Sequence, residues 1–336
     1  MKLAGQEDVQ SYLAQAQARG TLPHACLFTG PGGVGKRSLA RWLAALGLCQ
    51  AAVGQPCGTC SGCRAVALGT SADLCWVDRG AERQGISINQ VRQVQDFISL
   101  GSLSGSVRTV IVTDAHELSA EAANALLKSL EEPAEQVRFC LTTSAPRALP
   151  ATIRSRCSVF NLRLASASQV AALLRTAGAP AAQASELAAA AAGRPGLALR
   201  FLREPELYST RVAASQEALA YLLQPSWTSA QAIAARFASA EGETSGEIRV
   251  RALELLSLWS EAVFEALRWR VGYEKAARYQ ATRDAVQLVA GRWRKPNLLA
   301  AAQLIAKAGD RLRQNGHVRL TLESCFASLA LLAPDL

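Results

Sequence analysis

Short apolar runs alternate with amphipathic segments along the first half of the chain. Between the runs, segments such as 38–48 repeat apolar positions at helical spacing. The runs themselves are rich in β-branched and aromatic residues, and they lie at 25–29, 74–77, 107–112, 137–142 and 158–162. Strands that alternate with helices favour a parallel sheet covered by helices on both faces. We therefore predict an α/β domain over residues 1–163.

The second half of the chain has no such strand pattern. Residues 164–205 contain helical stretches broken at 178–180 and at 193–196, a size that fits a small helical domain. Beyond Pro205 amphipathic runs follow one another, at 209–223, 228–240, 246–271, 273–291, 296–315 and 319–332. This succession predicts an all-helical domain over residues 206–336.

Composition narrows the class of protein. The 336 residues suffice for two or three domains. No uncharged run approaches the roughly 20 residues that a membrane helix needs, and Glu7 and Asp8 stand where a signal peptide would be apolar. We expect a cytoplasmic protein with no membrane partner. The net charge of +9 suits contact with nucleic acid, but the basic residues are scattered, so charge alone leaves DNA binding open.

A glycine-rich segment, GPGGVGK, follows the first predicted strand and precedes a predicted helix. It fits the phosphate-binding pattern G-x-x-x-x-G-K-[ST] at every position but the last. Such a loop closes backbone N–H groups around phosphates, and its lysine reaches the β- and γ-phosphates. The candidate nucleotide-binding residues are Gly30, Gly32, Gly33, Gly35 and Lys36. Arg37 stands where a hydroxyl normally ligates Mg²⁺, which makes ATP binding doubtful and metal binding more so.

Four cysteines lie close together between residues 49 and 63. Three of them are separated by two residues each, and one lies upstream: Cys49, Cys57, Cys60 and Cys63. Four thiolates at this spacing fit the tetrahedral coordination of a closed, structural Zn²⁺ site. A redox-active C-x-x-C motif is the alternative, and such a motif would adjoin a thioredoxin-like strand.

Two further motifs carry a family resemblance. The segment 124–133 reads NALLKSLEEP and resembles the NALLK-LEEP segment of bacterial clamp-loader subunits, and Ser155-Arg156-Cys157 is similar to their S-R-C motif. With the glycine loop and the cysteine tract, they make the chain resemble AAA+ clamp-loader subunits of DNA polymerase III, of the delta-prime type. The resemblance implies an AAA+ domain over 1–163 with a zinc module at 49–63, a lid domain at 164–205 and a collar domain at 206–336.

The resemblance also implies site roles. Ser155 and Arg156 would form an arginine finger that acts in trans: the guanidinium of Arg156 would enter the ATP site of an adjacent subunit. Counted back from Asn124, the metal-binding Asp and the catalytic Glu of active relatives fall on Thr113 and Asp114; a second alignment places them on Asp114 and Ala115. The position of the relatives' sensor arginine is Gly196. Little or no intrinsic ATPase activity is therefore expected.

The implied function is that of a non-hydrolysing stator, an accessory subunit of the polymerase holoenzyme. It would join delta and gamma/tau subunits in a heteropentamer that loads the sliding clamp on primed DNA. One alternative is an ATP-hydrolysing motor of the gamma/tau type, which would need Ser or Thr at 37, an acidic pair at 113–114 and arginine at 196. Another is a zinc-dependent DNA-binding protein, which would need a concentrated basic face near 49–63, where Arg64 alone adjoins the tract.

Overall fold

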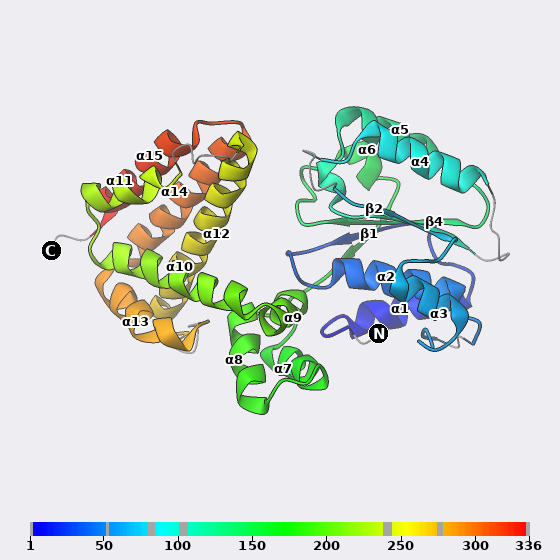
Figure 1. Cartoon of the computed structure of the whole chain (residues 1–336), viewed down its shortest axis with the longest axis horizontal. Coiled ribbons are helices and arrows are strands. Elements are labelled where there is room, and N and C mark those ends of the chain that lie inside the picture. Colours follow the sequence, from blue (N-terminus) through cyan, green and yellow to red (C-terminus); the bar gives the residue numbers. More distant parts are fainter. Residues whose placement is uncertain are drawn as a thin grey trace. The chain divides into compact units, whose positions relative to one another are not determined.

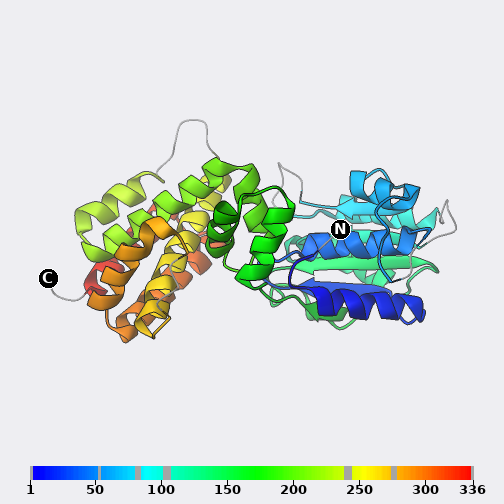
Figure 2. The ribbon, with the colours of Figure 1, turned by 90° about the horizontal axis from the view of Figure 1, so that it is seen from below.

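A computed structural model of the chain describes residues 3–51, 54–79, 85–100, 107–237, 244–273 and 278–333. They form two compact units (Figure 1). The first unit comprises Met1–Ala184 and Gly193–Leu199, and the second comprises Ser185–Ala192 and Arg200–Leu336. Figure 2 shows the ribbon from a second direction.

The first unit is built on a five-stranded parallel sheet with the strand order β2-β3-β4-β1-β5. The strands are β1 (Ala25–Thr29), β2 (Leu74–Val77), β3 (Arg108–Val112), β4 (Val137–Thr143) and β5 (Ser158–Asn161). Every predicted strand is confirmed to within one residue at each end. β1, β3 and β4 are buried at every position. Strands that are buried on both faces read as continuous apolar runs, which is why the sequence identified them.

Helices cover both faces of the sheet, as predicted (Figure 1). One face carries α1 (Glu7–Ala18), α2 (Lys36–Leu48) and α3 (Ser61–Leu68); the other carries α4 (Ile88–Ser99), α5 (Ala120–Glu131) and α6 (Ala151–Arg154). Successive side chains of a strand point to opposite faces. Phe28 of β1 therefore packs with Leu39 of α2, and Leu27 packs with Leu126 of α5.

The parallel sheet brings the carboxyl ends of its strands to one edge, where ligands bind in open α/β folds. The glycine loop follows β1, Thr113 follows β3 and Asp78 follows β2. β2 pairs with β3 as far as Val77 and Val112. The topology thus places these segments side by side although they are far apart in the sequence.

Three helices follow the sheet: α7 (Ala167–Thr176), α8 (Ala181–Ala191) and α9 (Pro195–Arg203). The predicted break at 178–180 is confirmed. The predicted break at 193–196 is too long, because α9 begins at Pro195, and the fixed φ of proline suits the first position of a helix. The boundary between the two units crosses this region. Whether 164–205 is a domain of its own stays a prediction.

The second unit is helical, as predicted. Its helices are α10 (Pro205–Leu223), α11 (Trp227–Ala235), α12 (Ser245–Arg270), α13 (Arg283–Arg292), α14 (Lys295–Arg313) and α15 (Val318–Leu332). The predicted helix at 273–291 is wrong as a single element: 274–277 lie outside the described residues, and α13 begins only after the 3₁₀ turn Gln280–Thr282. Residues 238–240 of the predicted helix 228–240 also lie outside them. No helix in the described ranges has the length and apolar character needed to cross a membrane.

Two tryptophans are fully buried in the second unit, and they differ in one hydrogen bond. Trp259 packs against the rings of Tyr221 and Phe326, and its Nε1 has no acceptor among the described residues. Trp293 Nε1 donates to the carbonyl oxygen of Leu222 at 2.8 Å. That carbonyl lies in the last turn of α10, where carbonyls have no N–H partner within the helix. Trp293 of the segment after α13 thus caps α10.

This difference predicts the outcome of a matched pair of substitutions. Trp293→Phe and Trp259→Phe both remove a pyrrole ring from a buried site, but only Trp293→Phe leaves a buried carbonyl unpaired. We expect Trp293→Phe to lower the free energy of unfolding by about 1–2 kcal/mol more than Trp259→Phe. Chemical denaturation followed by circular dichroism measures this, and equal losses would contradict the capping role.

Candidate functional site

Lys36 is the first residue of α2, and its side chain is buried within the glycine loop. Its Nζ donates to the carbonyl oxygens of Gly30 at 2.7 Å and Pro31 at 2.9 Å. Burial lowers the pKa of Lys36, and the nearby carboxylate of Asp114 opposes this shift. The amine that would meet a phosphate is therefore bonded to the loop itself, and phosphate binding requires both bonds to be exchanged.

Arg37 extends from the start of α2 to the ends of β2 and β3. Its Nη2 pairs with the carboxylate of Asp78 and lies 3.1 Å from Thr113 Oγ1 and 3.4 Å from Asp114 Oδ2. In P-loop NTPases the loop hydroxyl and a strand-end aspartate hold Mg²⁺ between these same elements. A divalent cation next to the guanidinium would be repelled. This geometry supports the sequence-based expectation of a lost metal site.

Asp78 is a site residue that the sequence analysis did not identify. Besides pairing with Arg37, its carboxylate accepts from Trp76 Nε1 and from the hydroxyl of Thr113, and its carbonyl oxygen accepts from Gln90 Nε2 at 2.8 Å. A signal was present, because an acidic residue directly after one strand of a parallel sheet lies beside the end of the next strand. Neither alignment of the acidic pair includes this residue.

Gly196 contacts the glycine loop directly. Its backbone N–H donates to the carbonyl oxygen of Gly33 at 2.8 Å. A Cβ atom on residue 196 would lie 3.0 Å from that oxygen. A side chain at this position, arginine included, would require the loop and the start of α9 to separate by a few tenths of an ångström. The contact gives a physical reason for glycine at the position where the resemblance expects an arginine.

Arg156, the predicted finger, is paired within the chain. Its Nη2 lies 2.5 Å from Glu131 Oε1, and its Nη1 donates to the carbonyl oxygen of Thr152 at 2.9 Å and to Ser155 Oγ at 3.4 Å. Glu131 ends α5 and belongs to the NALLKSLEEP segment, so the two motifs that carry the resemblance touch each other. Both side chains of the ion pair are partly exposed. Such pairs contribute about 0–1 kcal/mol, so a stronger anion can replace Glu131.

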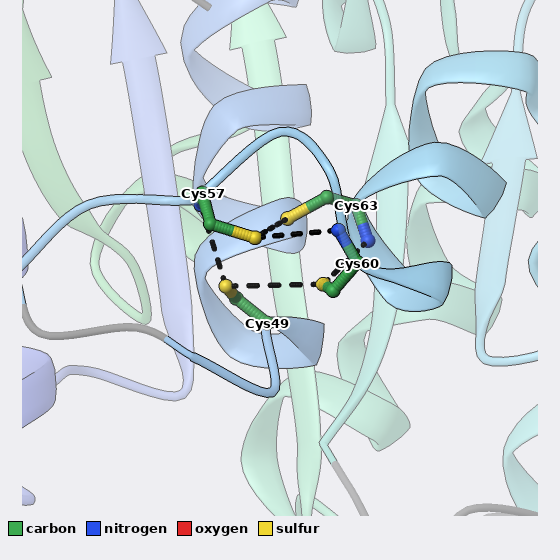
Figure 3. Close-up of side chains that lie close together, drawn as sticks. All are labelled: Cys49, Cys57, Cys60 and Cys63. Carbon is green, nitrogen blue, oxygen red and sulfur yellow. Dashed lines mark hydrogen bonds between the residues drawn. The ribbon is translucent and has the colours of Figure 1, made fainter.

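The four cysteines predicted to bind metal lie together (Figure 3). Their sulfur atoms are all within 4.8 Å of one another. Two sulfur pairs, Cys57 with Cys63 and Cys49 with Cys60, are 3.9 Å and 4.0 Å apart. A tetrahedron with Zn–S bonds of about 2.3 Å has edges of about 3.8 Å. The cluster therefore fits one metal ion, and four thiols around one point favour metal binding over a redox pair.

Backbone N–H groups point at the sulfurs of Cys57 and Cys60 and favour their thiolate forms. Cys57 Sγ accepts from the N–H of Cys60 at 3.4 Å, and Cys60 Sγ accepts from the N–H of Cys63 at 3.4 Å. The first of these bonds is the main cause that lowers the pKa of Cys57 to about 5, whereas burial raises the pKa of Cys63 to about 12. The thiolate is the form that binds metal.

Close packing of two helices brings Cys63 to the other three cysteines. A Cβ atom on Gly62, at the start of α3, would lie only 2.1 Å from the carbonyl oxygen of Leu48, the last residue of α2. Glycine is required at this contact. Cys49 directly follows α2, so the approach of the two helices assembles the cluster.

Comparison with known proteins identifies what the first unit is homologous to. Residues 5–166 match the family described as DNA polymerase III, delta subunit. The tau subunit of DNA polymerase III from Escherichia coli (strain K12) is 37% identical over 169 residues, which are 50% of this chain and 26% of that protein. The gamma subunit from Buchnera aphidicola is 32% identical over 174 residues, 52% of this chain and 47% of that protein. The chain thus spans about a quarter of the tau subunit's length.

Among solved structures, a gamma subunit-related protein from Thermotoga maritima aligns with 97% of this chain and 99% of its own, with a TM-score of 0.44 and 15% identity. Residues 5–166 form a delta-subunit-like domain, homologous to the tau and gamma subunits. The curated relatives named above are tau and gamma subunits, so the comparisons support this homology but not the narrower delta-prime assignment.

The ion pairs of Arg37 predict that the isolated chain hydrolyses ATP no faster than background, with or without Mg²⁺. The guanidinium of Arg37 would repel the metal ion, and at most one carboxylate of the acidic pair is present. Steady-state phosphate release measures this. Turnover that is lost in Lys36→Ala would contradict the prediction, whereas turnover that persists in Lys36→Ala reports a contaminant.

The cysteine cluster predicts one Zn²⁺ per chain with a structural role. Cys60→Ser should lose the metal and lower the melting temperature, because three thiolates no longer close the site. Cys75→Ser, a half-buried cysteine of β2 outside the cluster, is the matched control and should keep a full equivalent. Elemental analysis of the purified variants checks both, and full zinc in Cys60→Ser would refute the ligand assignment.

Proposed function

We propose that this chain is a clamp-loader subunit of DNA polymerase III that does not turn over ATP itself. It would supply Arg156 to the ATP site of a neighbouring gamma/tau subunit, which is the role that the resemblance to delta-prime subunits implies. The homology of residues 5–166 to tau and gamma subunits supports the loader assignment. The single observation that carries the non-hydrolysing role is the guanidinium of Arg37 between Asp78, Thr113 and Asp114.

The chemistry of the finger follows from the guanidinium. It is charged at all relevant pH values, and its planar fork of N–H donors matches phosphate oxygens. Placed against the γ-phosphate of a neighbour, it stabilises the charge that develops there during phosphoryl transfer. Arg156 would leave Glu131 for the more highly charged phosphate, while Ser155, which accepts from Nη1, would guide its direction.

The remaining parts have supporting roles in this proposal. Zn²⁺ at Cys49, Cys57, Cys60 and Cys63 would be structural, because four thiolates leave no position for water or substrate. The helical second unit would serve as the collar that joins delta and gamma/tau subunits in a heteropentamer. The assembled loader would act in the cytoplasm, placing the sliding clamp on primed DNA, for which the net charge of +9 is suitable.

A second candidate is an ATP-hydrolysing motor subunit of the gamma/tau type. The identity to tau and gamma subunits favours it. Arg37 and Gly196 favour the first candidate, because one stands where the metal would bind and the other lacks the side chain of a sensor arginine. Hydrolysis by the isolated chain separates the two candidates.

The finger predicts a defect that appears only in the assembly. Arg156→Ala should leave folding and complex formation intact, since its exposed ion pair contributes little to stability. ATP hydrolysis and clamp loading by the reconstituted complex should fall in part, because other subunits complete the other ATP sites. Arg156→Lys should not restore them, because an ammonium group lacks the planar fork.

Two controls accompany this measurement. Arg147→Ala removes an exposed arginine that takes no part in the proposed finger, and it should leave the rates unchanged. Glu131→Gln removes the internal partner but keeps Arg156, so the rates should be unchanged or higher. Full activity of Arg156→Ala in a confirmed complex would leave the chain without a catalytic role.

A further inference from the structure

A cavity beside the S-R-C motif shares only Ser155 with the sites described above. We propose that it is a docking pocket for an acidic side chain of the neighbouring subunit, with Arg154 as its anchor. The inference rests on the proposed function, because it takes the partner to be the subunit that receives Arg156. The cavity measures about 440 Å³ and lies within the first unit.

The floor of this pocket is formed by two pairs of facing residues on neighbouring strands, called rungs below. Leu27 of β1 pairs in register with Val159 of β5, and Thr29 pairs with Asn161. All four line the cavity. Because alternate residues of a strand share a face, these two rungs present one continuous surface on the side of α6.

The pocket exists because α6 is too short to cover the sheet on this side. α6 has four residues and is therefore about 6 Å long. β5 is an edge strand, so no further strand extends the floor. As a result Val159 is 55% exposed, whereas its rung partner Leu27 is fully buried. The methyl groups of Val159 thus add apolar surface to the hollow.

Arg154 gives the pocket its charge preference. It is the single charged residue that lines the cavity, and no described residue accepts a hydrogen bond from its guanidinium. Its Nε is buried without a partner. Nη1 and Nη2 are not buried in this way, so an incoming anion can pair with them. The planar fork suits a carboxylate, and the hydroxyl of Ser155 and the amide of Asn161 stand beside it.

The pocket and the finger share a residue. Ser155 lines the cavity and also accepts from Arg156 Nη1. Arg154 and Arg156 lie on either side of it, one unpaired and one held by Glu131. An occupant seated against Ser155 and Arg154 would fix the loop from which Arg156 reaches out. A partner that presents its ATP site to Arg156 necessarily lies near this pocket, which argues for a protein carboxylate as the occupant.

The test compares the affinity of full-length variants for the gamma/tau partner, measured at low and moderate salt. Arg154→Ala should weaken binding by about tenfold or more, because it removes one half of a buried ion pair. Asn161→Asp keeps Arg154 but places a carboxylate of equal size within the pocket, so it should weaken binding to a similar extent. Arg147→Ala is the matched control and should change the affinity less than twofold. Unchanged circular dichroism confirms folding of each variant.

Each outcome decides one point. If Arg154→Ala and Asn161→Asp bind like Arg147→Ala, the pocket proposal is wrong while the proposed function stands. If the wild-type chain does not bind the partner at all, both proposals are wrong. Orthophosphate and ATP are tested on the isolated chain by thermal shift. Stabilisation that is lost in Arg154→Ala would show a site for a small anion and overturn the docking pocket.

Discussion

The candidate nucleotide site depends on one interaction, in which an arginine stands where a metal ion would bind. Arg37 leaves the glycine loop and joins the ends of β2 and β3 through Asp78, Thr113 and Asp114. In a P-loop NTPase a divalent ion makes this connection only while nucleotide is bound. Here the guanidinium that makes the connection belongs to the chain itself. The positive charges of Lys36 and Arg37 balance the negative charges of Asp78 and Asp114. The edge of the sheet is therefore held together without a ligand.

The same edge explains the contact between the glycine loop and α9. A loop that encloses phosphates must keep its N–H groups open and its lysine free. In this chain Lys36 binds the carbonyls of its own loop, and Gly33 accepts from Gly196. The amine of Lys36 and the carbonyl of Gly33 thus already have partners within the first unit. These contacts are consistent with one another, and together they favour a fixed arrangement over a switching one.

The sequence could predict the features that depend on neighbouring residues, but not those that depend on contacts between distant segments. Buried strands appear as apolar runs, and metal ligands on a tight loop appear as spacing. The pairing of Arg156 with Glu131 joins a helix end to a loop in another part of the chain, and no local pattern reports it. Nor does a local pattern show that Arg154 Nε is buried without a partner among the described residues. The helix predicted at 273–291 failed because apolar periodicity continues through a 3₁₀ turn that ends before α13.

α2 links the two candidate sites of the first unit. It begins at Lys36, beside the ion pairs of Arg37, and ends at Leu48, directly before Cys49. Its 13 residues make a rod of about 20 Å. The cysteine cluster holds one end of this helix, and the ion pairs of Arg37 hold the other end. Loss of Zn²⁺ from the proposed site would loosen the far end of the helix that carries Arg37, so the cysteine cluster and the glycine loop would be coupled through one helix.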